Sequence, residues 1–392
     1  MLFPVALLNY LDRMMVATMR GSIRADIPSI ANDAQFGLLM ALFMWVYAFL
    51  SPVGGFLGDR FSRRAMVILS LIIWSAMTWL TGHVHTFTQM AWTRALMGAG
   101  EAFYVPTALA LIAEFHPGAT RSRAIGIHTA GIYAGQALGG LGGYIADSSS
   151  WRNAFTWFGA AGLVYSIVLC ILLRNSPARP ADLEHNPPLG FRSALRGLLG
   201  TGAFLVLLAY FTLPAISGWA VKNWLPTFLG SVLNLNQGPA GLAATGYVTL
   251  AALGGALLGG AFADRAARRS SRGRIYVSAF GTALCVPALI GLGLAGSKES
   301  AIFCMLLFGL GFGFFDTNNM PILCQIVRPE FRATGYGLMN MVSIGTGAII
   351  TVAMGAMRDS GVSLAVAFTG AAAAASLGVA LILRVHPKPD PK

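Results

Sequence analysis

Six ionisable side chains interrupt the long apolar runs of this sequence, and they are the residues best suited to chemistry. They are Asp12, Arg13, Arg94, Glu101, Lys222 and Asp316. Placing a charge in a membrane helix costs roughly 2.5–3.5 kcal/mol on insertion scales, so such residues are typical of functional sites. Fixed ion pairs that only hold helices together are the alternative interpretation.

The spacing of four of these residues predicts two ion pairs. Arg94 and Glu101 are seven residues apart, so they share one face of a helix and lie about 10 Å apart along it. Asp12 and Arg13 are adjacent, so their side chains point about 100° apart around a helix. We expect crossed pairing between two helices, with Asp12 facing Arg94 and Arg13 facing Glu101.

A carboxyl group paired with an arginine can couple the movement of a proton to that of an anion. Burial favours the protonated form of a carboxyl group, whereas a nearby cation favours the ionised form. Protonation of Glu101 would release Arg13 to bind an anionic substrate, and ionisation would reclaim it. We expect Asp12, Glu101, Arg94 and Asp316 to take part in proton coupling.

The second half of the chain offers a matching cation. Lys222 would place a second positive charge at the site, so that an anion bridges it and Arg13; a lysine that extends to the membrane surface is the alternative. Asp316 is followed by Asn318 and Asn319, whose amides suit sugar hydroxyls or hydrogen bonds between helices. The other candidate lining residues, each equally compatible with packing, are Asn9, Tyr10, Tyr104, Thr129, Tyr133, Gln136, Trp219 and Asn340.

The elements that must position these residues are membrane helices. Hydrophobic residues make up 56% of the chain and charged residues 11%, against roughly 25% charged in soluble domains. The apolar runs are continuous and reach the roughly 20 residues that span a bilayer, whereas barrel strands alternate apolar and polar residues. We expect an all-α polytopic membrane protein with twelve transmembrane helices, at about 2–20, 36–57, 65–82, 88–115, 123–146, 151–173, 201–230, 239–262, 275–295, 300–327, 335–357 and 363–384.

A repeated motif divides the chain into two related halves. G-x-x-x-D-R-x-x-R-R occurs at 55–64 and 260–269, and its aspartates Asp59 and Asp264 are 205 positions apart, about half of the 392 residues. We expect two pseudo-symmetric six-helix bundles, 1–175 and 200–392, joined by a proline-rich cytoplasmic linker, 176–199. The motif residues expected to gate the inner side, by pairing with nearby arginines and helix N-termini, are Asp59, Arg60, Arg63, Asp264, Arg265 and Arg268.

The distribution of lysine and arginine between the predicted loops indicates the orientation of the chain in the membrane. Of 27 lysines and arginines, 19 lie on one side of the predicted helices and five on the other, and this bias places both termini in the cytoplasm. The net charge of +12 therefore does not indicate a nucleic-acid partner. The first span begins at the first residue without a basic leader, so we expect no signal peptide. We expect a monomer in the bacterial inner membrane.

The twelve spans, the repeated hinge motif and the central linker resemble the major facilitator superfamily. That resemblance implies two six-helix bundles around a central cavity, alternating access and a site near the midplane. L-N-Y-L-D-R (8–13), R-A-L-M-G-A-G-E-A (94–102) and N-W-L-P-T-F-L (223–229) are similar to the anion:cation symporters, which include sialin-like and sugar-acid transporters. The first of these motifs, with G-E-A-F-Y (100–104) and R-S-R-A (121–124), also resembles the Spinster family of lysolipid transporters.

In the resembled families the residues matching Asp12, Arg13 and Glu101 are implicated in proton coupling and anion binding. One departure is Ser62, where the superfamily hinge usually has glycine, and we expect it only to tighten the loop.

We therefore expect a proton-coupled symporter of a small organic anion such as a sugar acid; the alternative is a Spinster-like transporter of lysolipids or other amphiphiles. An enzyme would need a nucleophile–base pair or a metal cluster, and the six histidines form no metal-spaced set in the spans. No metal or other cofactor is expected, protons being the coupling ion. A sensor that binds its ligand without transporting it is a further alternative.

Overall fold

The computed structural model describes residues 1–116, 120–174, 191–328 and 331–385. These residues divide into two compact units. The first consists of Met1–Asn186, Pro226–Gly246 and Thr351–Asp359, and the second of Pro187–Leu225, Tyr247–Ile350 and Ser360–Lys392. The first unit thus combines the first half of the chain with two short segments of the second.

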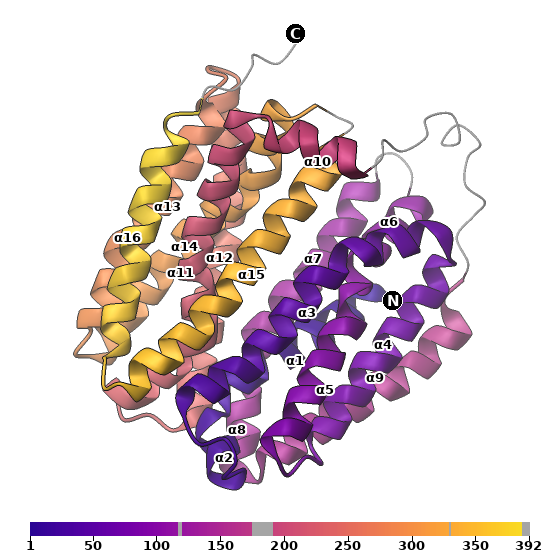
Figure 1. Ribbon diagram of the computed structural model, residues 1–392, viewed down its shortest axis with the longest axis vertical. Helices are drawn as coiled ribbons and strands as arrows, with labels where there is room; N and C mark the ends of the chain where they lie inside the picture. The colour runs from indigo at the N-terminus through magenta and orange to yellow at the C-terminus, as the bar shows by residue number, and fades with distance from the viewer. Residues whose placement is uncertain (117–119, 175–190, 329–330, 386–392) are drawn as a thin grey trace. The chain divides into compact units, whose positions relative to one another are not determined.

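The chain is helical throughout the described residues (Figure 1). The helices of the first half are α1 (Leu2–Thr18), α2 (Arg20–Asp26), α3 (Asp33–Arg60), α4 (Arg63–Thr81), α5 (Phe87–Ala102), α6 (Tyr104–Phe115), α7 (Arg121–Leu138), α8 (Leu141–Ser148) and α9 (Trp151–Leu172). Those of the second half are α10 (Phe191–Leu199), α11 (Gly202–Val232), α12 (Gln237–Ala267), α13 (Gly273–Leu294), α14 (Lys298–Ile326), α15 (Arg332–Asp359) and α16 (Leu364–Ile382). This all-helical architecture confirms the predicted fold class.

Among these residues, ten helical stretches are long and apolar enough to cross a membrane. The two remaining predicted spans correspond to α1, which has 17 residues, and to α7 with α8, between which the chain turns at Gly139 and Gly140. The predicted linker range ends in a helix, α10, whose Leu198 is buried in the second unit. The remainder of that range, residues 176–190, lies outside the described residues.

The helix packing repeats between the halves, as the repeated motif predicts. In the first unit α4 packs on both α5 and α9, and in the second unit α13 packs on both α14 and α16. Figure 1 shows α13 and α16 running side by side, as α4 and α9 do. The third predicted span of each half is therefore the packing partner of the fourth and sixth.

Small residues allow close helix contact in the first unit between α1 and α7. A Cβ atom at Gly131 would lie 2.6 Å from the carbonyl oxygen of Phe3, and one at Gly135 would strike the carbonyl of Leu7. Because lipid provides no hydrophobic drive between helices, such close backbone approach is a main source of helix association in membranes. These glycines therefore serve close packing of α7 against α1.

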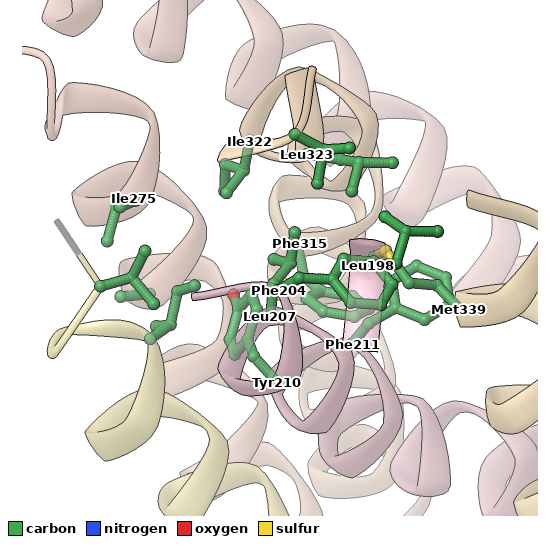
Figure 2. Close-up of a cluster of buried hydrophobic side chains, with 14 of the residues drawn as sticks. Leu198, Phe204, Leu207, Tyr210, Phe211, Ile275, Phe315, Ile322, Leu323 and Met339 are labelled. Atoms are coloured by element: carbon green, nitrogen blue, oxygen red, sulfur yellow. The ribbon is translucent and has the colours of Figure 1, made fainter. Parts of the chain in front are cut away.

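The core of the second unit combines aromatic and aliphatic side chains (Figure 2). The rings of Tyr210 on α11 and Phe315 on α14 meet edge to face, with centroids 5.4 Å apart. The Tyr210 hydroxyl lies 2.7 Å from the Ser278 hydroxyl and 2.9 Å from that of Thr282, both on α13. Three helices are thereby tied together by one side chain whose polar end is satisfied.

Candidate functional site

The central pair of the site joins α1 to α5. The Nε of Arg13 donates to Oε2 of Glu101, and the two side chains form an ion pair. The side chain of Glu101 is fully buried and that of Arg13 is 10% exposed. The predicted pairing of Arg13 with Glu101 is confirmed, and it places a compensated charge inside the bundle, where an unpaired charge would be costly.

Aromatic rings surround the guanidinium of Arg13. Its Cζ lies 4.6 Å from the ring centre of Tyr10, 5.1 Å from that of Phe43 and 4.4 Å from that of Tyr47. A guanidinium is weakly hydrated and is attracted to ring faces, so the rings fix its position without neutralising it. Arg13 therefore keeps a positive charge in an apolar, aromatic setting.

The predicted direct pairing of Asp12 with Arg94 is wrong. Oδ2 of Asp12 accepts a hydrogen bond of 3.1 Å from the hydroxyl of Thr78 on α4. Nη1 of Arg94 lies 3.0 Å from Sδ of Met97, and its Cζ lies 4.8 Å from the ring centre of Phe43. Asp12 and Arg94 are close enough to interact electrostatically, but their direct contacts are with Thr78 and Met97 instead of with each other.

The second unit holds the other predicted cation. Nζ of Lys222 lies 5.3 Å from the ring centre of Trp219 and 5.9 Å from that of Phe312, and Lys222 interacts electrostatically with Asp316. The side chain of Asp316 is exposed. Each unit therefore contains a cation that interacts with a carboxylate beside aromatic rings.

The two asparagines that follow Asp316 point into the helix packing. Asn318 is buried and donates from Nδ2 to the carbonyl of Phe314, at 2.8 Å, one turn earlier on the same helix. Asn319 is fully buried, and its amide has no hydrogen-bond partner in the part of the chain that the structure describes. This placement favours the packing interpretation over contact with sugar hydroxyls.

The other predicted lining residues differ in their surroundings. Tyr104 is fully buried, and its hydroxyl lies 3.0 Å from Nε2 of His128 and 3.3 Å from the carbonyl oxygen of Leu2. It lies inside the first bundle, which does not favour its predicted contact with substrate. The role of the partly accessible residues as lining remains a prediction; these residues are Tyr10, Thr129, Tyr133, Gln136, Trp219 and Asn340.

The sequence matches the Major Facilitator Superfamily over residues 2–352. This chain belongs to the major facilitator superfamily. An MFS-type efflux pump of Mycolicibacterium smegmatis is 28% identical to it, over 97% of this chain and 87% of the pump. Protein spinster homolog 1 of Bos taurus is 30% identical, over 86% of this chain and 68% of the relative. The chain is a transporter of this superfamily, and its resemblance to Spinster proteins is supported.

Solved structures confirm the fold. A crystal structure of a bacterial homolog to the human lysosomal transporter Spinster, in an inward-facing and unoccupied conformation, superposes with a TM-score of 0.76. The match covers 97% of this chain and 92% of that chain at 22% identity. This likeness shows the fold, and the family match with its transporter relatives makes the chain a multi-pass membrane transporter rather than an enzyme, as expected.

The second superfamily hinge motif forms a predicted contact. Asp264, near the end of α12, makes an ion pair of 3.0 Å with Arg274, the second residue of α13. This confirms that the motif aspartate pairs with a nearby arginine. Arg265 and Arg268 are exposed, and the gating role of the motif remains a prediction.

The first hinge motif is described in part. Arg63 at the start of α4 forms an ion pair with Glu114 of α6. The side chains of Asp59 and Arg60 lie outside the described residues. Ser62 caps α4 by accepting from the backbone N–H of Ala65 at 3.4 Å, so this serine begins the helix where the superfamily usually has glycine.

Sequence reasoning missed a second charged centre, which we call the Asp33 cluster: Arg20, Arg24, Asp33, Arg358 and Asp359. The buried carboxylate of Asp33 accepts from Nε of Arg20, Nη1 of Arg24 and Nη1 of Arg358, each at 2.7 Å. The carboxylate of Asp359 accepts at 2.8 Å from the backbone N–H groups of Asp33 and Ala34. The end of α15 is thereby fastened to α2 and α3. From the sequence these arginines are only charged residues near predicted loops, because no spacing along the chain indicates that they share Asp33 as a partner.

A cavity of about 250 Å³ lies beside the Asp33 cluster. Its polar lining residues are Thr18, Arg20, Thr227, Ser231, Gln237 and Arg358. Two of the three arginines that contact Asp33 therefore also face this cavity.

Proposed function

We propose that this transporter couples the movement of protons to that of an amphiphilic anion, of the lysolipid class, by alternating access. The observation that carries the proposal is the buried ion pair of Arg13 with Glu101. In this arrangement the cation that would bind an anionic head group is held by a carboxylate that a proton can neutralise.

Protonation of Glu101 removes the negative charge that holds Arg13. The guanidinium, still positioned by Tyr10, Phe43 and Tyr47, then pairs with the anionic group of the substrate. Loss of the proton on the other side of the membrane restores the ion pair and expels the anion. Proton and substrate therefore cross together, with Lys222 and Asp316 forming the corresponding pair in the other unit.

Aromatic rings next to both cations favour an amphiphile over a sugar acid. Arg13 is surrounded by three rings and Lys222 lies near two, which suits a substrate with both charge and apolar surface. The amides expected to bind sugar hydroxyls, those of Asn318 and Asn319, are buried in helix packing. The Spinster relatives support the same choice. We further propose a bacterial inner-membrane location with both termini in the cytoplasm.

A transport panel in proteoliposomes tests the substrate class. The purified protein is reconstituted with a pH-sensitive dye inside, and lysophosphatidylglycerol or a sugar acid such as glucuronate is added outside. Acidification of the lumen by the lysolipid, and not by the sugar acid, is the expected result. Acidification by the sugar acid alone would replace the proposed substrate with a small organic anion, and acidification by neither would contradict proton-coupled anion transport. Empty liposomes with the same lysolipid control for leakage.

A further inference from the structure

Several buried polar atoms of the first unit have no hydrogen-bond partner among the described residues. Besides Oε1 of Glu101, they include both amide atoms of Asn9 on α1, Oγ1 of Thr107 on α6 and Nδ1 of His128 on α7. An unsatisfied buried polar group costs about 1–3 kcal/mol, and buried groups in folded proteins are usually satisfied by protein or by ordered water. Four such groups in one bundle therefore indicate sites for water.

Asn9, Thr107 and His128 lie on one side of the ion pair, whereas Arg94, whose Nε is also unsatisfied, lies seven residues before Glu101 in the other direction. Asn9 lies one turn before Arg13 on α1 and close enough to Glu101 to interact with its carboxylate. Thr107 lies six residues beyond Glu101, about 9 Å further along the span at 1.5 Å per residue. His128 lies seven residues after the start of α7. All of them lead toward the end of the bundle at which α1 and α7 begin and α6 ends.

His128 and Tyr104 form a hydrogen-bonded link in this row. The Tyr104 hydroxyl has one proton but two neighbouring acceptors, the Leu2 carbonyl at 3.3 Å and Nε2 of His128 at 3.0 Å. If the hydroxyl donates to Leu2, then Nε2 carries the ring proton and Nδ1 is a bare acceptor; if it donates to Nε2, then Nδ1 carries a proton that lacks a protein acceptor in the described chain. In either tautomer Nδ1 is left for water.

The helix is interrupted beside Glu101. α5 ends at Ala102 and α6 begins at Tyr104, with Phe103 between them. Pro106 has no N–H to donate to the carbonyl of Ala102 four residues earlier. The carbonyl of Ala102 is therefore one further acceptor next to Glu101, and it lies between Glu101 and the residues Tyr104 and Thr107 along the chain.

We propose that Asn9, Tyr104, Thr107 and His128 line a hydrated path that carries protons between Glu101 and the end of the bundle where α1 begins. This inference rests on the proposed proton coupling. A proton adds to Nδ1 of neutral His128, the Nε2 proton passes to the Tyr104 oxygen, and the hydroxyl proton moves on through water toward Glu101. One proton is transferred, and both side chains end neutral.

Other charged and titratable groups face the two ends of this path. Glu101 is faced by Arg13 and Asp12 from α1 and by Arg94 from its own helix. Tyr104 is faced by Tyr10 from α1 and Tyr165 from α9. The substrate cation, Arg13, is thus at the Glu101 end, which separates proton delivery from substrate binding.

The test separates net proton movement from substrate exchange. The variants are His128→Gln, which keeps hydrogen bonding but not proton relay, and Thr107→Val, which removes one hydroxyl at constant shape. Thr93→Val is the matched control, because Thr93 donates to the Met90 carbonyl on α5 away from the path. Two rates are measured in proteoliposomes with labelled lysophosphatidylglycerol: uptake driven by a pH gradient, and exchange against unlabelled lysolipid without a gradient.

We expect His128→Gln and Thr107→Val to slow proton-driven uptake, the former by about tenfold or more, while exchange stays within about twofold of the unmodified protein. Unchanged proton-driven uptake in both variants would overturn the path, and so would loss of exchange in both, since that marks a structural role. Glu101→Gln distinguishes a failure of the proton path from a failure of the proposed proton coupling. If it loses proton-driven uptake while the other variants do not, only the path fails; if it retains that uptake, the proposed function itself fails.

Discussion

The guanidinium of Arg13 on α1 is paired with the carboxylate of Glu101 on α5, and its Cζ lies 4.6 Å from the ring centre of Tyr10 and 4.4 Å from that of Tyr47. The pair joins two helices through groups that are costly to bury singly and stable together. The stability of this ion pair and its loss when Glu101 is protonated are the two properties on which the proposed proton coupling depends.

A double-mutant cycle measures that strength. Arg13→Met leaves Glu101 as an uncompensated buried acid, and Glu101→Gln leaves Arg13 without its carboxylate. We expect each single change to destabilise the protein by about 3–5 kcal/mol, and the double variant by clearly less than the sum. Thermal unfolding in detergent, followed by tryptophan fluorescence, provides the comparison. Additive effects would show that the two side chains do not stabilise each other.

The Asp33 cluster is expected to lock one end of the first unit. Asp33→Asn removes the carboxylate that Arg20, Arg24 and Arg358 share and leaves the two hydrogen bonds of Asp359 to hold the end of α15. The end of α15 should therefore separate more readily from α2 and α3. Thr18, which is 3% exposed and lines the adjacent cavity, should then become accessible. The readout is the labelling rate of Thr18→Cys by a membrane-impermeant thiol reagent, in a background lacking the native cysteines.

Asp26→Asn is the matched control for this experiment. Asp26 accepts from Trp151 and Arg152 and does not contact α15, so its loss should leave labelling of Thr18→Cys unchanged. Several-fold faster labelling in Asp33→Asn alone is the expected result. Equal labelling in the two variants would contradict the lock.

Much of the fold and the central pair could be predicted from sequence. Long apolar runs predict the membrane spans. The Arg13–Glu101 pair was predicted from the positions of these residues on two helices. The same spacing predicted an Asp12–Arg94 pair that does not form, because Asp12 instead contacts Thr78 and Arg94 instead contacts Met97. Thr78 and Met97 are uncharged, and their position is fixed only by packing. The Asp33 cluster joins residues more than 300 positions apart, and no periodicity connects them.

The two prolines that follow carboxyl residues within the spans have different effects on their helices. Pro106 and Pro321 follow a carboxyl residue by the same five positions, yet the span is interrupted before Pro106 and α14 continues through Pro321. Proline removes one backbone donor at either site. Neighbouring helices determine whether the chain bends or only loses a hydrogen bond.

Because α7 lies close against α1, we expect the stability of the protein to fall when a single methyl group is added at this contact. A Cβ at Gly135 would strike the Leu7 carbonyl and lie 3.1 Å from the Leu11 nitrogen, so Gly135→Ala should lower the unfolding temperature and the folded yield. Gly126→Ala, on the same helix, meets no atom within 4 Å and should stabilise the helix by up to about 1 kcal/mol. Equal behaviour of the two variants in a thermal-shift assay would contradict this packing.

The Asp264–Arg274 pair should affect rate more than stability. Asp264 is 63% exposed, and exposed ion pairs contribute about 0–1 kcal/mol. We therefore expect Asp264→Asn and Arg274→Gln to unfold within a few degrees of the unmodified protein but to transport more slowly, since the pair joins the ends of α12 and α13. Transport at the normal rate in both variants would remove the gating role from this motif.

Acidification driven by lysolipid measures most directly whether Glu101 carries the coupled proton. In proteoliposomes containing a pH-sensitive dye, we expect lysophosphatidylglycerol to acidify the lumen with the unmodified protein and not with Glu101→Gln, although that variant still exchanges labelled lysolipid. Equal acidification by the two proteins would show that Glu101 does not carry the proton.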